Sequence, residues 1–170
     1  MIIVSNTSPI NNLAAVEQLH LLKALYGSII IPEAVYRELT GCGPTIAGCR
    51  EVQTYDWIEM REVVNRSFLE SLLGRVNEGE AEAIALAIEL NADKIVIDEN
   101  RGRALANEYG LKVTGVLGIL VEAKNRGLIP LVKSVMDRLI DEADFWVSKS
   151  LYSQILQLAG ERSEERRVGE

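Results

Sequence analysis

Short apolar segments alternate along this chain with longer segments that have the spacing of amphipathic helices. Three apolar segments rich in Ile and Val have the composition of strands that are buried on both faces, and they lie at 2–4, 29–31 and 95–97. Helical patterns separate these segments from one another. Because parallel strands are joined by crossovers that usually contain a helix, the alternation predicts a parallel sheet covered by helices.

The remaining elements follow from the same local signals. Shorter apolar runs predict a strand or edge piece at 57–60 and a strand at 111–114. Helices are expected as two short pieces within 9–26, at 32–40 and 67–73, after the N-cap Asn77, up to Gly110, and at 116–126, 130–141 and 148–159. We expect one domain over 1–159, and a disordered tail over 160–170, where apolar periodicity stops.

The composition is that of a globular protein, with 48% hydrophobic and 25% charged residues among 170. No apolar run approaches the ~20 residues needed to cross a bilayer, and the first residues do not resemble a signal peptide, so we expect a cytoplasmic protein without a membrane partner. The formal net charge of −7 argues against a protein that coats nucleic acid by bulk electrostatics. It leaves nucleic acid open as a substrate, because bound divalent cations can present a positive face to phosphates.

Acidic residues cluster in the stretch 78–106, and helical geometry separates them. At 100° per residue, Glu80 lies on the side of the small apolar residues of its helix. Glu78, Glu82 and Glu89 lie roughly opposite and are expected to form a solvated stripe. Glu80 could also serve only as a first-turn acid that suits the helix dipole.

Four polar side chains are expected to meet at one edge of the sheet. Asn6 and Asp98 follow strands, whereas Glu38 and Glu80 lie on or beside inward faces of helices. In open parallel sheets, sites form beyond the carboxyl ends of the strands. Several carboxylates in one cleft repel one another, and Mg²⁺ or Mn²⁺ is the usual way to compensate. Taken alone, Asp98 would also suit a turn or an N-cap.

Five motifs follow one another along the chain, and they are VSNTSPI, IPEAVYREL, NEGEAEAIALAIEL, KIVIDENRGRALA and LKVTGVLGILVEAKNRGLI. In this order they resemble the PIN-domain superfamily, and more closely its prokaryotic branch of small uncharacterised PIN-like proteins, often predicted to bind nucleic acid. The resemblance runs from about Ile2 to Ala159. It implies a three-layer α/β/α fold around a central parallel sheet of four to five strands, with acidic residues at one edge. Many members of that superfamily are Mg²⁺- or Mn²⁺-dependent ribonucleases, frequently the toxin of a toxin–antitoxin pair.

The resemblance also implies roles for individual residues. The metal ligands would be Asn6, Glu38, Glu80 and Asp98, of which the three carboxylates would be catalytic. Glu99 would belong to the outer shell of the metal, and Arg101 and Arg103 would contact the substrate, although an Arg that is solvated or paired within the fold is the commoner case. The implied partners are RNA, expected as a single strand, an antitoxin protein and a second copy of the chain.

The chain departs from the superfamily pattern at Asn6, where Asp is usual. An amide offers one carbonyl oxygen but no charge, so the affinity for a metal should fall. Two hypotheses therefore stay open. The chain is a metal-dependent ribonuclease, or it is a catalytically weakened PIN-like protein that acts by binding RNA or a protein partner. Phosphotransfer receivers and aspartyl phosphatases are disfavoured, because the first strand is followed by Ser5-Asn6-Thr7-Ser8 rather than by their acidic motifs.

Overall fold

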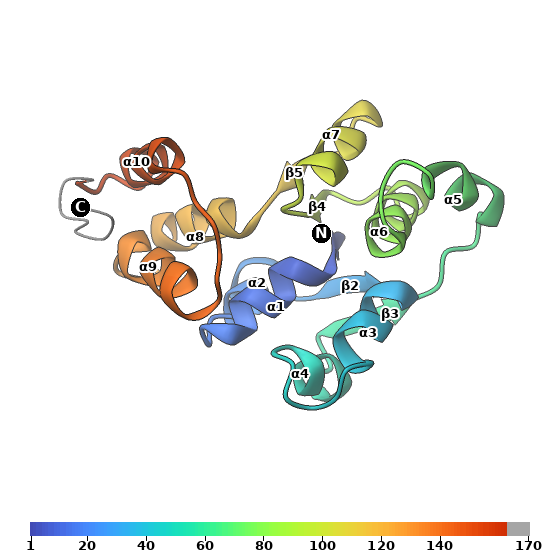
Figure 1. Cartoon of the computed structure of the whole chain (residues 1–170), viewed down its shortest axis with the longest axis horizontal. Coiled ribbons are helices and arrows are strands. Elements are labelled where there is room, and N and C mark those ends of the chain that lie inside the picture. The colour runs from blue at the N-terminus through green and yellow to red at the C-terminus, as the bar shows by residue number, and fades with distance from the viewer. Residues whose placement is uncertain (163–170) are drawn as a thin grey trace.

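The computed structural model describes residues 1–162 and has a central sheet of five parallel strands (Figure 1). In the order β3-β2-β1-β4-β5, β1 lies at the centre. The strands are β1 (Ile3–Ser5), β2 (Ile29–Pro32), β3 (Ile58–Arg61), β4 (Lys94–Val96) and β5 (Val113–Thr114). This arrangement confirms the predicted α/β fold with a parallel sheet, and β3 is an edge strand as expected.

The inner strands β1, β2 and β4 are largely apolar because helices cover both faces of the sheet at its centre. Successive residues of a strand point to opposite faces. In β1, Ile3 belongs to one hydrophobic cluster and Val4 to the other, and in β4 Ile95 and Val96 divide in the same way. All four side chains are at most 1% exposed. Continuous apolar runs are therefore required at the centre of the sheet, since neither face meets water there, whereas the edge strand β3 has three exposed residues.

The helices divide between these two clusters. The larger cluster contains side chains of α1 (Thr7–Ala15), α2 (His20–Tyr26), α3 (Glu33–Thr40), α4 (Cys49–Thr54), α8 (Val116–Asn125), α9 (Val132–Glu142) and α10 (Lys149–Leu158). The smaller cluster contains those of α5 (Arg66–Leu72), α6 (Glu78–Glu89) and α7 (Asn100–Glu108). Figure 1 shows α8, α9 and α10 gathered at one end of the molecule and α5 and α6 at the other.

Two details differ from the sequence-based expectations or extend them. Helix α4 follows the loop 42–48 and was not expected, because its six residues are too few for a helical pattern to be recognised. Residues 163–170 of the expected disordered tail lie outside the described residues, but Glu161 is described. Its carboxylate accepts hydrogen bonds from the backbone N–H groups of Val132 and Lys133 at the start of α9.

Within residues 1–162, no helix is long and apolar enough to cross a membrane.

Candidate functional site

Three buried side-chain oxygens have no hydrogen-bond partner within the described residues. They are Asn6 Oδ1, Glu80 Oε2 and Asp98 Oδ2. A buried acceptor without a partner costs about 1–3 kcal/mol, so folded proteins rarely leave one unless it serves a purpose. All three belong to the four residues that sequence reasoning assigned to one site. The absence of hydrogen-bond partners is a criterion that does not depend on the sequence pattern, and it points to the same edge of the sheet.

Asn6 connects the central strand to the first helix. It is the N-cap residue of α1, and its backbone N–H donates to Val96 O at 2.9 Å, which fixes it beside the end of β4. Only 4% of the residue is exposed, and its side chain makes no capping hydrogen bond to α1. The amide side chain is therefore free of the helix-capping role that Asn commonly has at this position.

Glu80 is held by the first turn of α6. Its Oε1 accepts from the backbone N–H of Asn77 at 3.2 Å, while its own N–H donates to the Asn77 side chain at 2.8 Å. This capping box fixes one carboxylate oxygen, and Oε2 lies beside Ile97 and Gly102. Burial raises the pKa of Glu80, and the charges of Glu99 and Glu38 raise it further, against the lowering effects of the Asn77 N–H and of Arg101.

Asp98 links the end of β4 to the start of α8. Its Oδ1 accepts from the backbone N–H of Val116 at 3.0 Å. Burial raises the pKa of Asp98 to about 6, although the Val116 N–H and Arg103 act in the opposite direction. The charge of Glu99 also raises this pKa. Since Glu99 acts on both Glu80 and Asp98, these three carboxyl groups lie within electrostatic reach of one another.

Glu38 and Glu99 lie at the exposed rim of this group. The Glu38 carboxylate accepts a short hydrogen bond from the Thr7 hydroxyl, and Glu99 Oε1 accepts from the Ser8 hydroxyl at 2.9 Å. Both hydroxyls belong to the first turn of α1, directly after Asn6. The inward position expected for Glu38 is therefore wrong, because its helix packs inward through Ala34, Val35 and Leu39 and leaves Glu38 in solvent.

The two arginines after Asp98 lie near the carboxylates but are held by backbone carbonyls. Arg101 Nη2 donates to Arg75 O at 2.6 Å, and Arg103 Nη1 donates to Ile97 O at 2.9 Å. Arg101 lowers the pKa of Glu80, and Arg103 lowers that of Asp98. Each guanidinium has further N–H groups, so both side chains keep donors for a phosphate.

Three glycines that the sequence analysis did not single out lie against the carboxylates. A methyl group at Gly79 would lie 2.5 Å from Glu38 Oε1, and one at Gly102 would lie 3.1 Å from Glu80 Oε2. A methyl group at Gly115 would overlap the Asp98 carboxylate. Each glycine thus lets backbone approach one acidic side chain closely. Sequence reasoning could have found them only from their spacing, since each lies within one to three residues of a turn or helix start.

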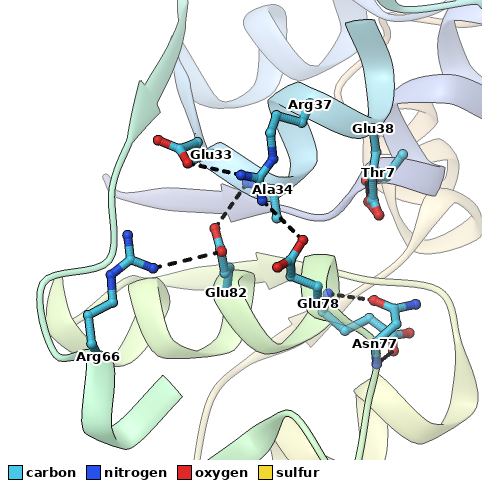
Figure 2. A network of polar contacts seen from close by, with 10 residues as sticks. Thr7, Glu33, Ala34, Arg37, Glu38, Arg66, Asn77, Glu78 and Glu82 are labelled. Atoms are coloured by element: carbon cyan, nitrogen blue, oxygen red, sulfur yellow. Dashed lines mark hydrogen bonds and ion pairs between the residues drawn. The ribbon is translucent and has the colours of Figure 1, made fainter. Parts of the chain in front are cut away.

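A polar network fixes α3 above α6 (Figure 2). Glu82 Oε1 accepts from the backbone N–H of Ala34 at 3.0 Å, and Arg37 forms an ion pair with Glu78 at 3.0 Å. Glu82 is only 4% exposed, so its expected place in a solvated stripe is wrong. The reason is that α3 and α5 cover this side of α6, and Glu82 points to the otherwise unpaired start of α3.

The donor set fits a hard divalent cation. The unpartnered atoms are all oxygens, two of them on carboxylates, and such ligands suit Mg²⁺ and Mn²⁺. Within residues 1–162, no group of three or more His, Cys, Asp or Glu side chains is arranged to hold a metal ion. The set described here contains only two such residues, Glu80 and Asp98, because its third oxygen comes from the Asn6 amide. Sequence reasoning counted Glu38 among the ligands, but its carboxylate is bound to Thr7.

Comparison with known proteins agrees with this architecture. The model of a family described as PIN domain (DUF3368) matches residues 2–161. The chain is similar to the solved structure of a PilT N-terminus domain protein from the archaeon Sulfolobus solfataricus P2, with a TM-score of 0.56 and 18% sequence identity. That similarity covers 72% of this chain and 93% of the other, and at this identity it concerns the fold alone. No curated protein matches the chain.

Proposed function

Because the chain belongs to the PIN-domain family, whose members are generally nucleases, we propose that it is a ribonuclease that depends on Mg²⁺ or Mn²⁺. The observation that carries the proposal is the set of three buried oxygens without partners at the carboxyl edge of β1 and β4. A structural role alone would have paired them with N–H groups, because buried acceptors are almost always satisfied. A cation that is coordinated by all three would remove the cost of burying them.

Asn6, Glu80 and Asp98 would hold the cation, and Glu38 and Glu99 would lie in its outer surroundings. When bound, it would supply a Lewis acid for the phosphate and lower the pKa of a bound water. The chain itself orients the ligands, since the Asn77 and Val116 N–H groups each hold one oxygen of a carboxylate and leave the other oxygen free. Arg101 and Arg103 would position the phosphate backbone through their remaining N–H groups.

The test is metal-dependent cleavage of single-stranded RNA by the native chain and by two isosteric variants. Asp98→Asn keeps the shape of the side chain but removes its charge, so cleavage should fall at least ~100-fold, in the range known for the loss of one electrostatic catalytic group. Asn6→Asp adds a third charged ligand and should increase cleavage at low Mg²⁺ concentration. Glu78→Gln, which changes an exposed carboxylate at the start of the same helix as Glu80, is the matched control.

One observation favours a second function. Asn6 replaces the usual acidic residue, so the site has fewer charges with which to hold a cation at millimolar concentration. The alternative is therefore a protein of the same fold that binds RNA or a protein partner without cutting. No cleavage by the native chain together with cleavage by Asn6→Asp would support this alternative. No cleavage and no metal binding by the native chain or either variant would reject the assignment of the site residues. The antitoxin partner and the homodimer stay predictions.

A further inference from the structure

A cleft of about 760 Å³ opens beside Asp98 and Glu99. One wall comes from the carboxyl edge of the sheet and from α1, and it contributes polar side chains. Another part of the lining comes from residues 143–146, between α9 and α10, and from α10 itself. The lining residues used below are Ser8, Asn12, Asn100, Arg103, Phe145 and Trp146.

Trp146 is the most exposed aromatic residue at this cleft, with 82% of its surface in solvent. Its neighbours Phe145 and Val147 both pack against the larger hydrophobic cluster. The backbone N–H of Phe145 also donates to Leu139 O at 3.1 Å, which ties the segment to the end of α9. Anchors on both sides therefore hold Trp146 outward over the cleft.

Within residues 1–162, Trp146 is also an aromatic side chain without a ring partner. Two other exposed aromatics have one, since Tyr55 stacks on Trp57 at 5.6 Å and Tyr109 meets Phe68 edge-on at 5.4 Å. An indole buries some 150–250 Å² when it is covered, so leaving one open to water gives up a large favourable contribution. The exposed Trp146 indole at the cleft is therefore available to a ligand that would cover it.

We propose that Trp146 is a stacking platform for one base of single-stranded RNA, next to the phosphate that lies at Asp98. The proposal rests on the ribonuclease function and names a substrate contact for the same site. Every base has a flat face that stacks on an indole, so this contact requires an unpaired base but no particular sequence. A base in a duplex is already stacked between its neighbours and is unavailable to the ring.

The chemistry of the cleft favours RNA over a protein segment as the occupant. Asn12 and Asn100 offer donors and acceptors of the kind that bind base edges and sugars, and Arg103 keeps N–H groups for a phosphate besides the one that donates to Ile97 O. The Ser8 hydroxyl is bound to Glu99, and the carboxylates of Asp98, Glu99 and Asp144 in the same lining would need a bound cation before a phosphate could lie beside them. These polar side chains line the same cleft as the indole and Asp98. A single strand in this cleft would thus meet polar groups as well as the indole.

The test measures binding separately from cleavage. A fluorescein-labelled single-stranded RNA of about ten nucleotides, within the site sizes usual for such proteins, is titrated with the full-length chain by anisotropy, once in EDTA and once with Ca²⁺ as the divalent cation. Trp146→Ala should raise the Kd about 5- to 150-fold, which is the cost of ~1–3 kcal/mol per stacked base. Trp146→Phe should restore most of the affinity, because a phenyl ring still stacks. Leu158→Ala is the matched control, because Leu158 is an exposed apolar residue at the end of α10 and does not line the cleft. This substitution should leave the Kd unchanged.

Two further measurements test whether the contact is specific for an unpaired base. In a Trp57→Phe background, Trp146 is the remaining tryptophan, and its fluorescence should be quenched by the single strand. A duplex of the same sequence should bind native chain and Trp146→Ala equally. Equal affinity of native chain and Trp146→Ala for the single strand would overturn the proposal, as would an equal loss for the duplex. No binding of the single strand by the native chain in either buffer would overturn it as well.

The outcomes distinguish this proposal from the proposed function. If the native chain cleaves RNA and Trp146→Ala leaves the Kd for the single strand unchanged, the ribonuclease function stands and the stacking platform is rejected. Binding that depends on Trp146 without cleavage would keep the platform and reject the ribonuclease in favour of an RNA-binding protein. Sedimentation of native chain and Trp146→Ala serves as the last control. A change of oligomeric state, with RNA affinity unaltered, would assign the indole to a contact between copies and overturn the proposal.

Discussion

Replacing the Asp98 carboxylate by an amide should make the metal-free protein more stable while removing its activity. Burial raises the pKa of Asp98 from 3.8 to about 6, so the ionised form is unfavourable in the folded state. At ~1.4 kcal/mol for each tenfold change in the ionisation equilibrium, this difference corresponds to about 3 kcal/mol. Residual hydration of the partly exposed side chain reduces the gain, and we expect about 1–3 kcal/mol for Asp98→Asn at neutral pH.

The sign of the pH dependence follows from the raised pKa. The folded protein binds the Asp98 proton more tightly than the unfolded chain does, so the protonated carboxyl stabilises the fold. This contribution is fully present below about pH 4 and is lost as the pH rises through about 6. The stability difference between Asp98→Asn and the native chain should therefore be largest above pH 7 and shrink towards pH 4.

Urea unfolding in EDTA, followed by circular dichroism across this pH range, measures the effect. Asp56→Asn is the matched control, because Asp56 carries the same carboxylate but is exposed, and its substitution should change the free energy of unfolding by less than ~0.5 kcal/mol. A variant Asp98→Asn that is less stable than the native chain at neutral pH would refute the reasoning. So would a gain that does not depend on pH.

Two other substitutions probe the support of the site and of the C-terminal helices. Gly115→Ala should lower cleavage ~10- to 100-fold in a folded protein, since its methyl group would displace the Asp98 carboxylate; steady-state kinetics and circular dichroism check this. Glu161→Gln should destabilise the chain by ~1–2 kcal/mol in urea unfolding, because its carboxylate caps α9 and binds Lys124. Burial raises the pKa of Glu161, but Lys124 and the cap outweigh this effect and lower the pKa. The loss should thus be seen above pH ~5 and vanish as the pH falls through that lowered pKa.

The pattern of the sequence was sufficient for the fold and for the placement of Asn6, Glu80 and Asp98. Strands that are buried on both faces require continuous apolar runs, and the runs at 2–4, 29–31 and 95–97 are long enough to be recognised. Asn6 and Asp98 could be placed because parallel strands end at one edge. Glu80 could be placed because helix periodicity put it on the apolar side, and it is 3% exposed.

The errors arose where tertiary contacts decide burial. Periodicity assigned Glu82 to the solvent side of α6, but α3 and α5 cover that side and bury it at 4% exposure. Glu38 was expected to point inward, although the start of α1 provides a hydroxyl that holds it at the rim. The close approach of Gly115 to Asp98 joins residues from two elements, and one sequence contains no signal for such a contact.

The central claim is that the unpartnered oxygens of Asn6, Glu80 and Asp98 together bind a divalent cation. Anomalous scattering from crystals soaked in Mn²⁺ tests it directly, because manganese is located independently of any activity. The account predicts one strong peak at about 2.0–2.3 Å from Glu80 Oε2 and Asp98 Oδ2, with Asn6 Oδ1 in its coordination sphere. No peak at this position, or a peak that is bound by Glu38 and Glu99 alone, would contradict the account.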